Sequence, residues 1–402
     1  MNILVFNCGS SSQSARLYQV GEGDQPKIVG DFKATSVDTH TSAAPKLSWR
    51  IHNDRGEETF PALTHPQVAE RIIAILRQRG LRVDAVGHRF VHGGDLFTKT
   101  TLIDAEVMQA LRGCFALAPI HNPNSFSVIE VCRSLLPEAK QAAVFDTAFH
   151  AHLPEAARGY ALPRDVVDKF GYRKYGFHGL SCQYVSGQAA RMLGKPIDQV
   201  KLIICHLGTG GSSVTAFADG RSQDTSMGYS PLAGLVMSTR CGDLDPEIVI
   251  DLVRRGYDAG EIEQLLGSRS GLIGLSGYSS NLAEIIDRAE AGDKACRLAY
   301  EIYANRVRHY LGAYLWRLNG ADAILFTDGI GVNSWKLREK VCANAENLGV
   351  QLDHAANRGA NPAAATWVQA DASKVKILVL PTDEERVILD ETRLLVYLAN
   401  KK

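Results

Sequence analysis

The feature that most constrains the fold is a strand-and-turn pattern that occurs twice in the chain. One copy spans residues 3–12 and reads ILVFNCGSSS, and the other spans 202–211 and reads LIICHLGTGG. Each is a short apolar run, typical of a buried strand, that ends in a turn rich in Gly, Ser and Thr. The repeat fits two related domains in tandem, and chance similarity explains a pattern this short equally well.

Composition limits the functional classes. The 402 residues contain 44 Lys and Arg against 44 Asp and Glu, and this balance gives no electrostatic reason to expect nucleic acid as a partner. At about 150 residues per domain, two to three domains are expected. No apolar run reaches the roughly 18 residues of a membrane span and no signal peptide is recognisable, so we expect a cytoplasmic protein without membrane contact that binds a small molecule.

The eight cysteines are scattered singly, which is typical of reduced, mostly buried thiols and not of a zinc or disulfide framework. His88 and His92 are four residues apart, a spacing that suits a metal pair on a helix. Gly87, Gly93 and Gly94 flank them, so we expect a strand running into a loop and no metal ligation by these histidines.

Four further apolar runs end in polar or charged residues and predict strands of an α/β sheet: 83–89, 142–146, 323–328 and 377–384. Ligands of open α/β sheets gather beyond the carboxyl ends of the strands, so these terminal residues are site candidates. Helical periodicity and end signals predict helices over 64–80, 295–319 and 383–399, with the apolar stripe of the second in the core.

Both glycine-rich turns, 9–12 and 208–213, offer close backbone approach and hydroxyl donors that suit phosphates. Neither carries the P-loop motif, and either alone is more typical of an ordinary turn than of a phosphate site. Arg89 and Arg240 also stand beside glycine-rich backbone, where a guanidinium can bind a carboxylate or a phosphoryl group. The structural alternative is an arginine paired with Asp243 or Asp245.

A series of motifs in order along the chain resembles those of the acetate kinase family: NCGSSS at 7–12, HRFVHGG at 88–94, APIHNP at 118–123, FDTAFH at 145–150, YGFHG at 175–179, HLG at 206–208, DTSMG at 224–228 and PTDEE at 381–385. The resemblance implies an α/β fold with two ribonuclease-H-like domains of the acetate and sugar kinase, Hsp70 and actin type, with a cleft between them. It implies an N-terminal domain 1–149, completed by a C-terminal helix 385–402, a nucleotide-binding domain 150–384, and a homodimer.

The implied activity is reversible, Mg²⁺-dependent transfer of a phosphoryl group from ATP to acetate, giving acetyl phosphate and ADP. By this resemblance Arg89 and Arg240 hold the carboxylate and the migrating phosphoryl group, and His178 donates to the equatorial oxygens. Asp146 acts at the same centre. Asn7 and Glu384 would organise Mg²⁺, with Mn²⁺ as a substitute.

Each of these roles has a structural alternative. Asp146 could be a helix cap, His178 a hydrogen-bonded turn residue, and Glu384 a first-turn carboxylate that interacts with the helix dipole. Finding all of them in their family context favours the catalytic roles.

The resemblance also implies two binding regions. Val91, Ile120, Phe177 and Pro231 match the positions that line the family's methyl pocket. Relatives that prefer propionate carry a smaller residue at the position of Val91, so acetate is expected ahead of propionate. The donor's phosphates and nucleotide would contact a larger set: Ser10, Ser12, Ser14, His206, Leu207, Gly208, Thr209, Gly210, Asn281, Ala283, Asp328, Gly329, Ile330 and Gly331.

Departures from the family pattern gather on the nucleotide side. Ser14 stands where a lysine is usual, with Arg16 nearby. Thr209 replaces an asparagine, Asn281 and Ala283 replace an Asp-x-Arg pair, and Asp328 precedes the altered stretch Gly329-Ile330-Gly331-Val332-Asn333.

Thr209, Ser14 and Asp328 resemble the branch of the family that uses pyrophosphate or orthophosphate. That branch carries bulkier residues where this chain has Gly329 and Ile330, so ATP stays the expected donor and pyrophosphate or phosphate the alternative. The same fold also serves non-enzymatic nucleotide switches. Those lack the paired arginines, so an enzyme is favoured.

Overall fold

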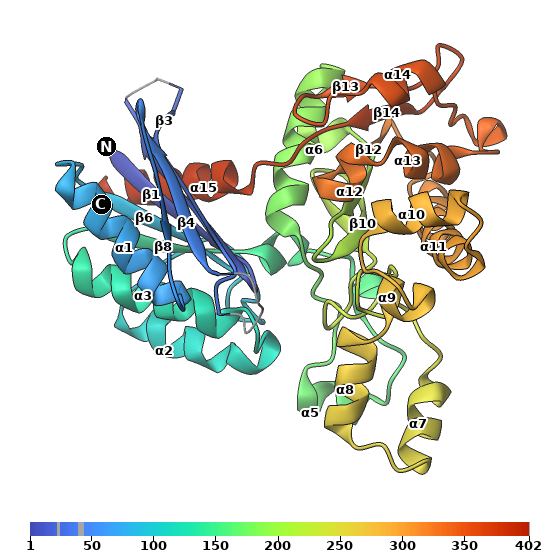
Figure 1. Cartoon of the computed structure of the whole chain (residues 1–402), viewed down its shortest axis with the longest axis horizontal. Helices are drawn as coiled ribbons and strands as arrows, with labels where there is room; N and C mark the ends of the chain where they lie inside the picture. Colours follow the sequence, from blue (N-terminus) through green and yellow to red (C-terminus); the bar gives the residue numbers. More distant parts are fainter. Residues whose placement is uncertain (22–24, 39–43, 402) are drawn as a thin grey trace. The chain divides into compact units, whose positions relative to one another are not determined.

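The computed structural model describes residues 1–21, 25–38 and 44–401. These residues form two compact units, Met1–Phe149 with Asp383–Lys402, and His150–Thr382 (Figure 1). Lys402, the last residue of the helix expected to complete the first domain, lies outside the described residues. Over the described ranges, no helix has the length and apolar character needed to cross a membrane.

The first unit is built on a mixed sheet with the strand order β5-β4-β3-β2-β1-β6-β8-β7. Its strands are β1 Asn2–Cys8, β2 Ser12–Gln19, β3 Lys27–Thr35, β4 Lys46–Ile51, β5 Asp54–Thr59, β6 Ala85–Phe90, β7 Thr101–Leu102 and β8 Lys140–Phe145. β1 pairs antiparallel with β2 and parallel with β6, which in turn pairs parallel with β8. The carboxyl ends of β1, β6 and β8 therefore lie at one edge.

Helices cover both faces of this sheet (Figure 1). One face packs on α1 (His65–Gln78) and α3 (Asn122–Leu135), and α2 (Ala105–Gly113) contacts α3. The other face meets α15 (Glu384–Asn400) along β1, β6 and β8. A Cβ on Gly87 would come within 2.3 Å of Thr392 and 2.8 Å of Ile388, so β6 needs a glycine where α15 crosses it.

The second unit repeats this topology. Its sheet has the order β11-β10-β9-β12-β14-β13, with β9 Leu202–Leu207, β10 Ser212–Ala218, β11 Arg221–Thr225, β12 Ala323–Thr327, β13 Thr366–Trp367 and β14 Lys376–Val379. β9 pairs antiparallel with β10 and parallel with β12, which pairs parallel with β14. The two copies of the repeated pattern thus form strands with equivalent neighbours, β1 in one sheet and β9 in the other.

The helices of the second unit are α4 Glu155–Arg158, α5 Arg164–Phe170, α6 Gly179–Leu193, α7 Pro246–Arg254, α8 Ala259–Ser268, α9 Gly271–Ser276, α10 Leu282–Glu290, α11 Lys294–Leu318, α12 Asp328–Asn333, α13 Trp335–Cys342 and α14 His354–Gly359. α11 packs against β9 and β10, and α6 against β9 and β12. Tyr303, Val307, Leu311 and Tyr314 of α11 lie in the core, as its apolar stripe predicts.

The strands and helices predicted above are confirmed, with ends that differ by a few residues. The interpretation of His88 and His92 is also correct, since His88 lies in β6 and His92 follows it. All eight cysteines are free, and all but Cys241 are buried.

Candidate functional site

The first cluster of predicted site residues begins with an ion pair between Arg89 and Asp146. Arg89 is near the end of β6 and Asp146 directly follows β8, so the parallel pairing of these strands brings them together. Arg89 Nη2 lies 2.6 Å from Asp146 Oδ2, and Arg89 Nε donates to both carboxylate oxygens at 3.2 Å. The Asp146 side chain is only 1% exposed. Asp146 is therefore a buried partner that fixes the guanidinium of Arg89.

Asn7 and Glu384 complete this cluster from β1 and the first residue of α15. Arg89 Nη1 donates to Asn7 Oδ1 at 3.1 Å and lies 4.0 Å from Glu384 Oε2. Asn7 Nδ2 donates to Glu384 Oε2 at 3.0 Å. The structure thus brings together Asn7, Arg89, Asp146 and Glu384, all within the first unit.

The charges of this cluster do not balance, because one guanidinium faces two carboxylates. Burial raises the pKa of Glu384 to about 7; Arg89 and the Asn7 amide oppose this rise, whereas Asp146 and Glu385 add to it. Burial would lower the pKa of Arg89, but the carboxylates of Asp146 and Glu384 outweigh it and the pKa is raised. The two carboxylates therefore exceed the single guanidinium in charge, and an additional cation would stabilise the cluster.

That chemistry fits a divalent cation such as Mg²⁺. Mg²⁺ binds through one or two protein carboxylates and fills its other positions with water and substrate phosphates. Within residues 1–21, 25–38 and 44–401, no group of three or more His, Cys, Asp and Glu side chains forms a metal cage. Mg²⁺ does not need such a cage, because it keeps several water and phosphate ligands. The carboxylates of Glu384 and Asp146 and the amide oxygen of Asn7 therefore suit it.

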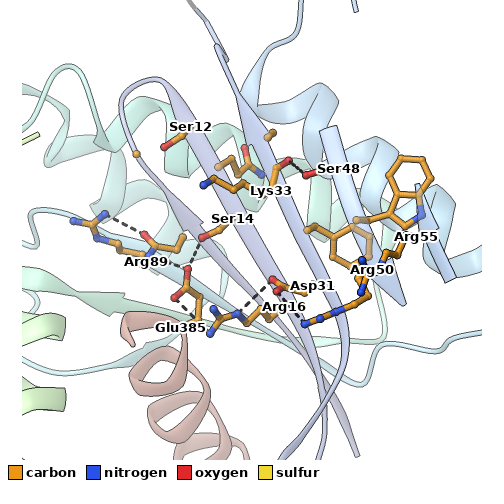
Figure 2. A pocket seen from close by; sticks show the side chains of 16 residues that line it. Ser12, Ser14, Arg16, Asp31, Lys33, Ser48, Arg50, Arg55, Arg89 and Glu385 are labelled. Carbon is orange, nitrogen blue, oxygen red and sulfur yellow. Dashed lines mark hydrogen bonds and ion pairs between the residues drawn. The ribbon is translucent and has the colours of Figure 1, made fainter. Parts of the chain in front are cut away.

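A polar groove of about 750 Å³ adjoins this cluster (Figure 2). It is lined by the turn residues Gly9 and Ser12 and by side chains on the face of β2–β5 that is turned away from the α1 core. Of the predicted phosphate-binding residues here, Ser12 lines the groove and Ser10 is exposed in the turn. Ser14 also lines the groove, and its hydroxyl donates a hydrogen bond to Glu385.

The second cluster lies around the loop that joins β9 to β10. A Cβ on Gly211 would lie 3.2 Å from His178 Nε2 and 3.3 Å from Arg240 Nη1, so both side chains rest against the loop. The rings of His178 and His206 stack with centroids 4.1 Å apart. His206 Nε2 is 3.3 Å from Asp328 Oδ2. His178, His206, Arg240 and Asp328 thus surround one glycine-rich turn of the second unit.

Serine hydroxyls hold both histidine rings. Ser213 Oγ lies 2.9 Å from His178 Nδ1, and Ser181 Oγ lies 2.8 Å from His206 Nδ1. Neither serine was predicted from the sequence as a partner of a histidine. Ser213 could have been found, because it belongs to the predicted phosphate turn, whereas the sequence around Ser181 on α6 does not indicate a site residue.

Arg240 is a largely buried cation, and no carboxylate among the described residues lies within ion-pair distance of it. Its Nη1 donates to the Pro231 carbonyl at 3.4 Å and contacts Met237 Sδ at 3.7 Å, and burial lowers its pKa. The predicted structural alternative, pairing with Asp243 or Asp245, is wrong. Asp243 accepts from Arg306 and Tyr310, and Asp245 caps α7. An unpaired buried charge is costly, which favours an anionic ligand at Arg240.

A more apolar pocket of about 420 Å³ lies beside the same loop and is lined by Thr209, Asn281, Leu282, Ala283, Ile286, Asp287, Gly329, Ile330, Asn333, Ser334, Trp335 and Lys336. Five predicted nucleotide residues are in this set. Leu207 and Gly331 do not line it and are buried, and Gly210 is exposed at the tip of the turn. The Asn281 side chain also caps α10, accepting from the Ala283 backbone at 3.0 Å.

The four residues predicted for the methyl pocket are divided between the units. Val91 and Ile120 belong to the first unit, where Val91 is buried and Ile120 is 64% exposed. Phe177 and Pro231 belong to the second, where Phe177 is buried and Pro231 half-buried.

Comparisons with known proteins agree with this architecture. A family model described as the Acetokinase family matches residues 2–390. Acetate kinase of Clostridium novyi is 40% identical over 407 residues, which cover 100% of both chains. The solved structure of Porphyromonas gingivalis acetate kinase aligns at 36% identity with a TM-score of 0.88, over 98% of this chain and 99% of that one. A propionate kinase from Francisella tularensis gives the same identity, TM-score and coverage. The predicted α/β fold class is confirmed.

Proposed function

Because the chain belongs to the acetokinase family, we propose that it is an acetate kinase, an enzyme that reversibly transfers a phosphoryl group from ATP to acetate. The products in this direction are acetyl phosphate and ADP. The observation that carries the proposal is Arg240, a half-buried guanidinium without a carboxylate partner among the described residues, beside His178 and a glycine-rich turn. Such a group neutralises the charge of a phosphoryl group in transfer.

The chemistry needs no strong base. A carboxylic acid with a pKa near that of Glu, about 4.3, is already ionised at neutral pH. Its oxygen attacks the terminal phosphorus of ATP; as the new O–P bond forms, the bond to the bridging oxygen breaks and ADP leaves with that electron pair. Because the acid is already ionised, Asp146 is not needed as a base to remove a proton from it. The contacts of Asp146 with Arg89 support an orienting role.

Charge stabilisation and positioning supply the catalysis. Arg89 and Arg240 hold the acetate carboxylate and the migrating phosphoryl group, and His178 donates to its equatorial oxygens. Asn7 and Glu384, with Asp146 beside them, would hold Mg²⁺ or, as a substitute, Mn²⁺. Such a cation would supply positive charge for the phosphate oxygens of the donor.

The donor assignment rests on the pocket beside Thr209. Its apolar lining by Leu282, Ile286 and Ile330 suits an adenine ring, which pyrophosphate lacks. The remaining predicted contacts of the donor phosphates, Ser10, Ser12, Gly208 and Gly210, belong to the two glycine-rich turns. Pyrophosphate or orthophosphate is the second candidate. It is supported by the resemblance of Ser14, Thr209 and Asp328 to the branch of the family that uses these donors.

The acceptor assignment rests on Val91, whose two methyl groups limit the space for a longer chain. Acetate is the preferred acid and propionate the poorer substrate. One extra methylene in such a pocket is worth about 1 to 3 kcal/mol, so propionate is disfavoured and still accepted.

The proposal extends to the setting of the enzyme. We expect a cytoplasmic homodimer whose partners are small molecules, with no binding of nucleic acid or membranes. The even balance of 44 basic and 44 acidic residues supports the absence of nucleic-acid binding only. A nucleotide switch without catalysis is disfavoured by the presence of both Arg89 and Arg240.

Acetyl phosphate supplied with ADP, with orthophosphate or with neither tests the proposal directly. ATP formation with ADP as acceptor is the expected result, and it should require Mg²⁺. Faster turnover with orthophosphate would replace the donor assignment by the pyrophosphate-linked one. Absence of turnover with either acceptor would favour a binding protein.

A further inference from the structure

A second polar network lies directly beside the proposed metal cluster, on β2 and the start of α15. Ser14 and Arg16 are two residues apart on β2 and point to the same face of the sheet, opposite the core residues Ala15 and Leu17. Figure 2 shows both side chains beside Glu385, at the end of the groove nearest α15. Arg16 has no role in the reaction as derived so far, and Ser14 is predicted only as a contact of the donor's phosphates.

The arginine and the serine bind the first turn of α15 from two sides. Arg16 Nη1 donates to Asp383 Oδ1 at 2.8 Å and lies 3.9 Å from Glu385 Oε2. The Ser14 hydroxyl donates to the other oxygen of Glu385, Oε1. Asp383 in turn caps α15 by accepting from the Arg386 backbone at 3.2 Å. The residues on both sides of Glu384 are thereby tied to β2.

Two more contacts fix Arg16 itself. Its Nε donates to Asp31 Oδ1 on β3 at 3.4 Å, and its Nη1 also donates to the Tyr18 hydroxyl at 3.4 Å. The Arg16 side chain is 26% exposed and that of Glu385 13%. This degree of burial makes the contacts worth more than an ordinary surface ion pair.

The network matters for Glu384 because the Asn7 amide is shared. Asn7 Nδ2 donates to Glu384 Oε2 at 3.0 Å and, more weakly, to Glu385 Oε1 at 3.4 Å. Once Ser14 and Arg16 engage Glu385, its charge is compensated and Asn7 stays with Glu384.

We propose that Arg16 and Ser14 are positioning residues that hold the Asp383–Glu385 turn so that Glu384 and Asn7 are arranged for a divalent cation. The inference deepens the proposed function, since it rests on Glu384 as a metal ligand. Partners that orient metal ligands typically change metal affinity by about 10- to 100-fold when removed. Removal of Arg16 should therefore weaken the cation more than it weakens the fold.

Mn²⁺ binding, followed by electron paramagnetic resonance in the presence of ADP and without turnover, provides the test. Arg16→Ala should raise the Mn²⁺ dissociation constant about 10- to 100-fold, and Arg16→Lys, which keeps the charge, should recover most of the affinity. Ser14→Ala removes one hydrogen bond and should give a smaller rise. It also serves as the second variant should Arg16→Ala fail to fold.

Arg386→Ala is the matched control, because Arg386 lies on the same helix turn and pairs with Asp390 at 2.9 Å. It should leave Mn²⁺ affinity unchanged. A lowered Tm with wild-type Mn²⁺ affinity in both Arg16→Ala and Ser14→Ala would reduce the network to a structural clamp and overturn the inference. Mn²⁺ binding by a wild-type protein that transfers no phosphoryl group would overturn the proposed function instead and leave the network's role intact.

Discussion

The carboxylate of Asp328 is paired with His206 inside the turn that is proposed to receive phosphates. Asp328 Oδ2 lies 3.3 Å from His206 Nε2, and a Cβ on Gly208 would come within 2.1 Å of the same oxygen. Asp328 adopts a φ of 60°, an unusual value for a residue other than glycine. A fixed negative charge at this point opposes a polyphosphate that enters the turn.

Asp328→Asn should therefore improve the use of ATP. The change keeps the shape of the side chain and removes its charge. Two unit charges at about 4 Å in the dielectric of water repel by about 1 kcal/mol, so the KM for ATP should fall about fivefold. Initial rates at varied ATP measure it. Asp287→Asn is the control, because Asp287 lines the apolar pocket with a side chain that is 78% exposed. An unchanged or higher KM in Asp328→Asn would show that the carboxylate does not oppose the donor.

Arg240→Ala should remove most of the activity without unfolding the protein. Loss of one fixed electrostatic donor typically lowers kcat about 10²- to 10³-fold. Because Arg240 is buried without a carboxylate partner, its removal should leave Tm unchanged or raise it. Steady-state rates and thermal unfolding measure both effects. Arg255→Ala, which breaks only the exposed pair with Asp251, should retain full activity. Wild-type kcat in Arg240→Ala would refute its assigned role.

Val91→Ala should shift the acid preference towards propionate. Val91 is 6% exposed at the end of β6, and removal of its two methyl groups leaves space for one more methylene. The ratio of kcat/KM for propionate to that for acetate should rise about tenfold or more. Rates with both acids under identical donor concentrations give this ratio. If it stays constant, Val91 does not line the acyl pocket.

His88 should make the stability of the protein fall in mild acid. Burial lowers the pKa of His88 from its ordinary 6.5 to about 4, against an opposing hydrogen bond to Gln141. His88 in the unfolded chain therefore binds a proton below about pH 6.5, whereas His88 in the folded chain binds one only below about pH 4. The stabilisation is complete above pH 6.5 and is lost as pH falls towards 4, at up to about 1.4 kcal/mol per pH unit.

Urea unfolding of the wild type and of His88→Gln across this pH range isolates the effect. The variant lacks the titrating group and should show a shallower decline in the free energy of unfolding. Other groups titrate in the same range, so the difference between the two proteins is the quantity to compare. Parallel pH profiles would mean that folding does not lower the pKa of His88.

Sequence patterns predicted the positions of Asn7, Arg89 and Asp146 well because parallel strands bring their carboxyl ends to one edge. They failed where a partner comes from a distant element. Nothing near Arg240 indicates that Arg306 and Tyr310 of α11 occupy Asp243 and leave the guanidinium unpaired. The sequence likewise gives no sign that the return of the chain at Asp383 brings Glu385 to the hydroxyl of Ser14. The partner of each such side chain depends on which groups from distant elements lie near the same acceptor in the folded protein.

The pairing of Asn7 with Glu384 joins residues 377 positions apart in the chain. During synthesis the amide of Asn7 leaves the ribosome long before the glutamate that completes its cluster. At about 5 to 20 residues per second the interval is roughly 20 to 75 s. A nascent chain that already carries all the strands of the first unit would still lack α15, so the ability to bind a metal should appear only after α15 has been synthesised.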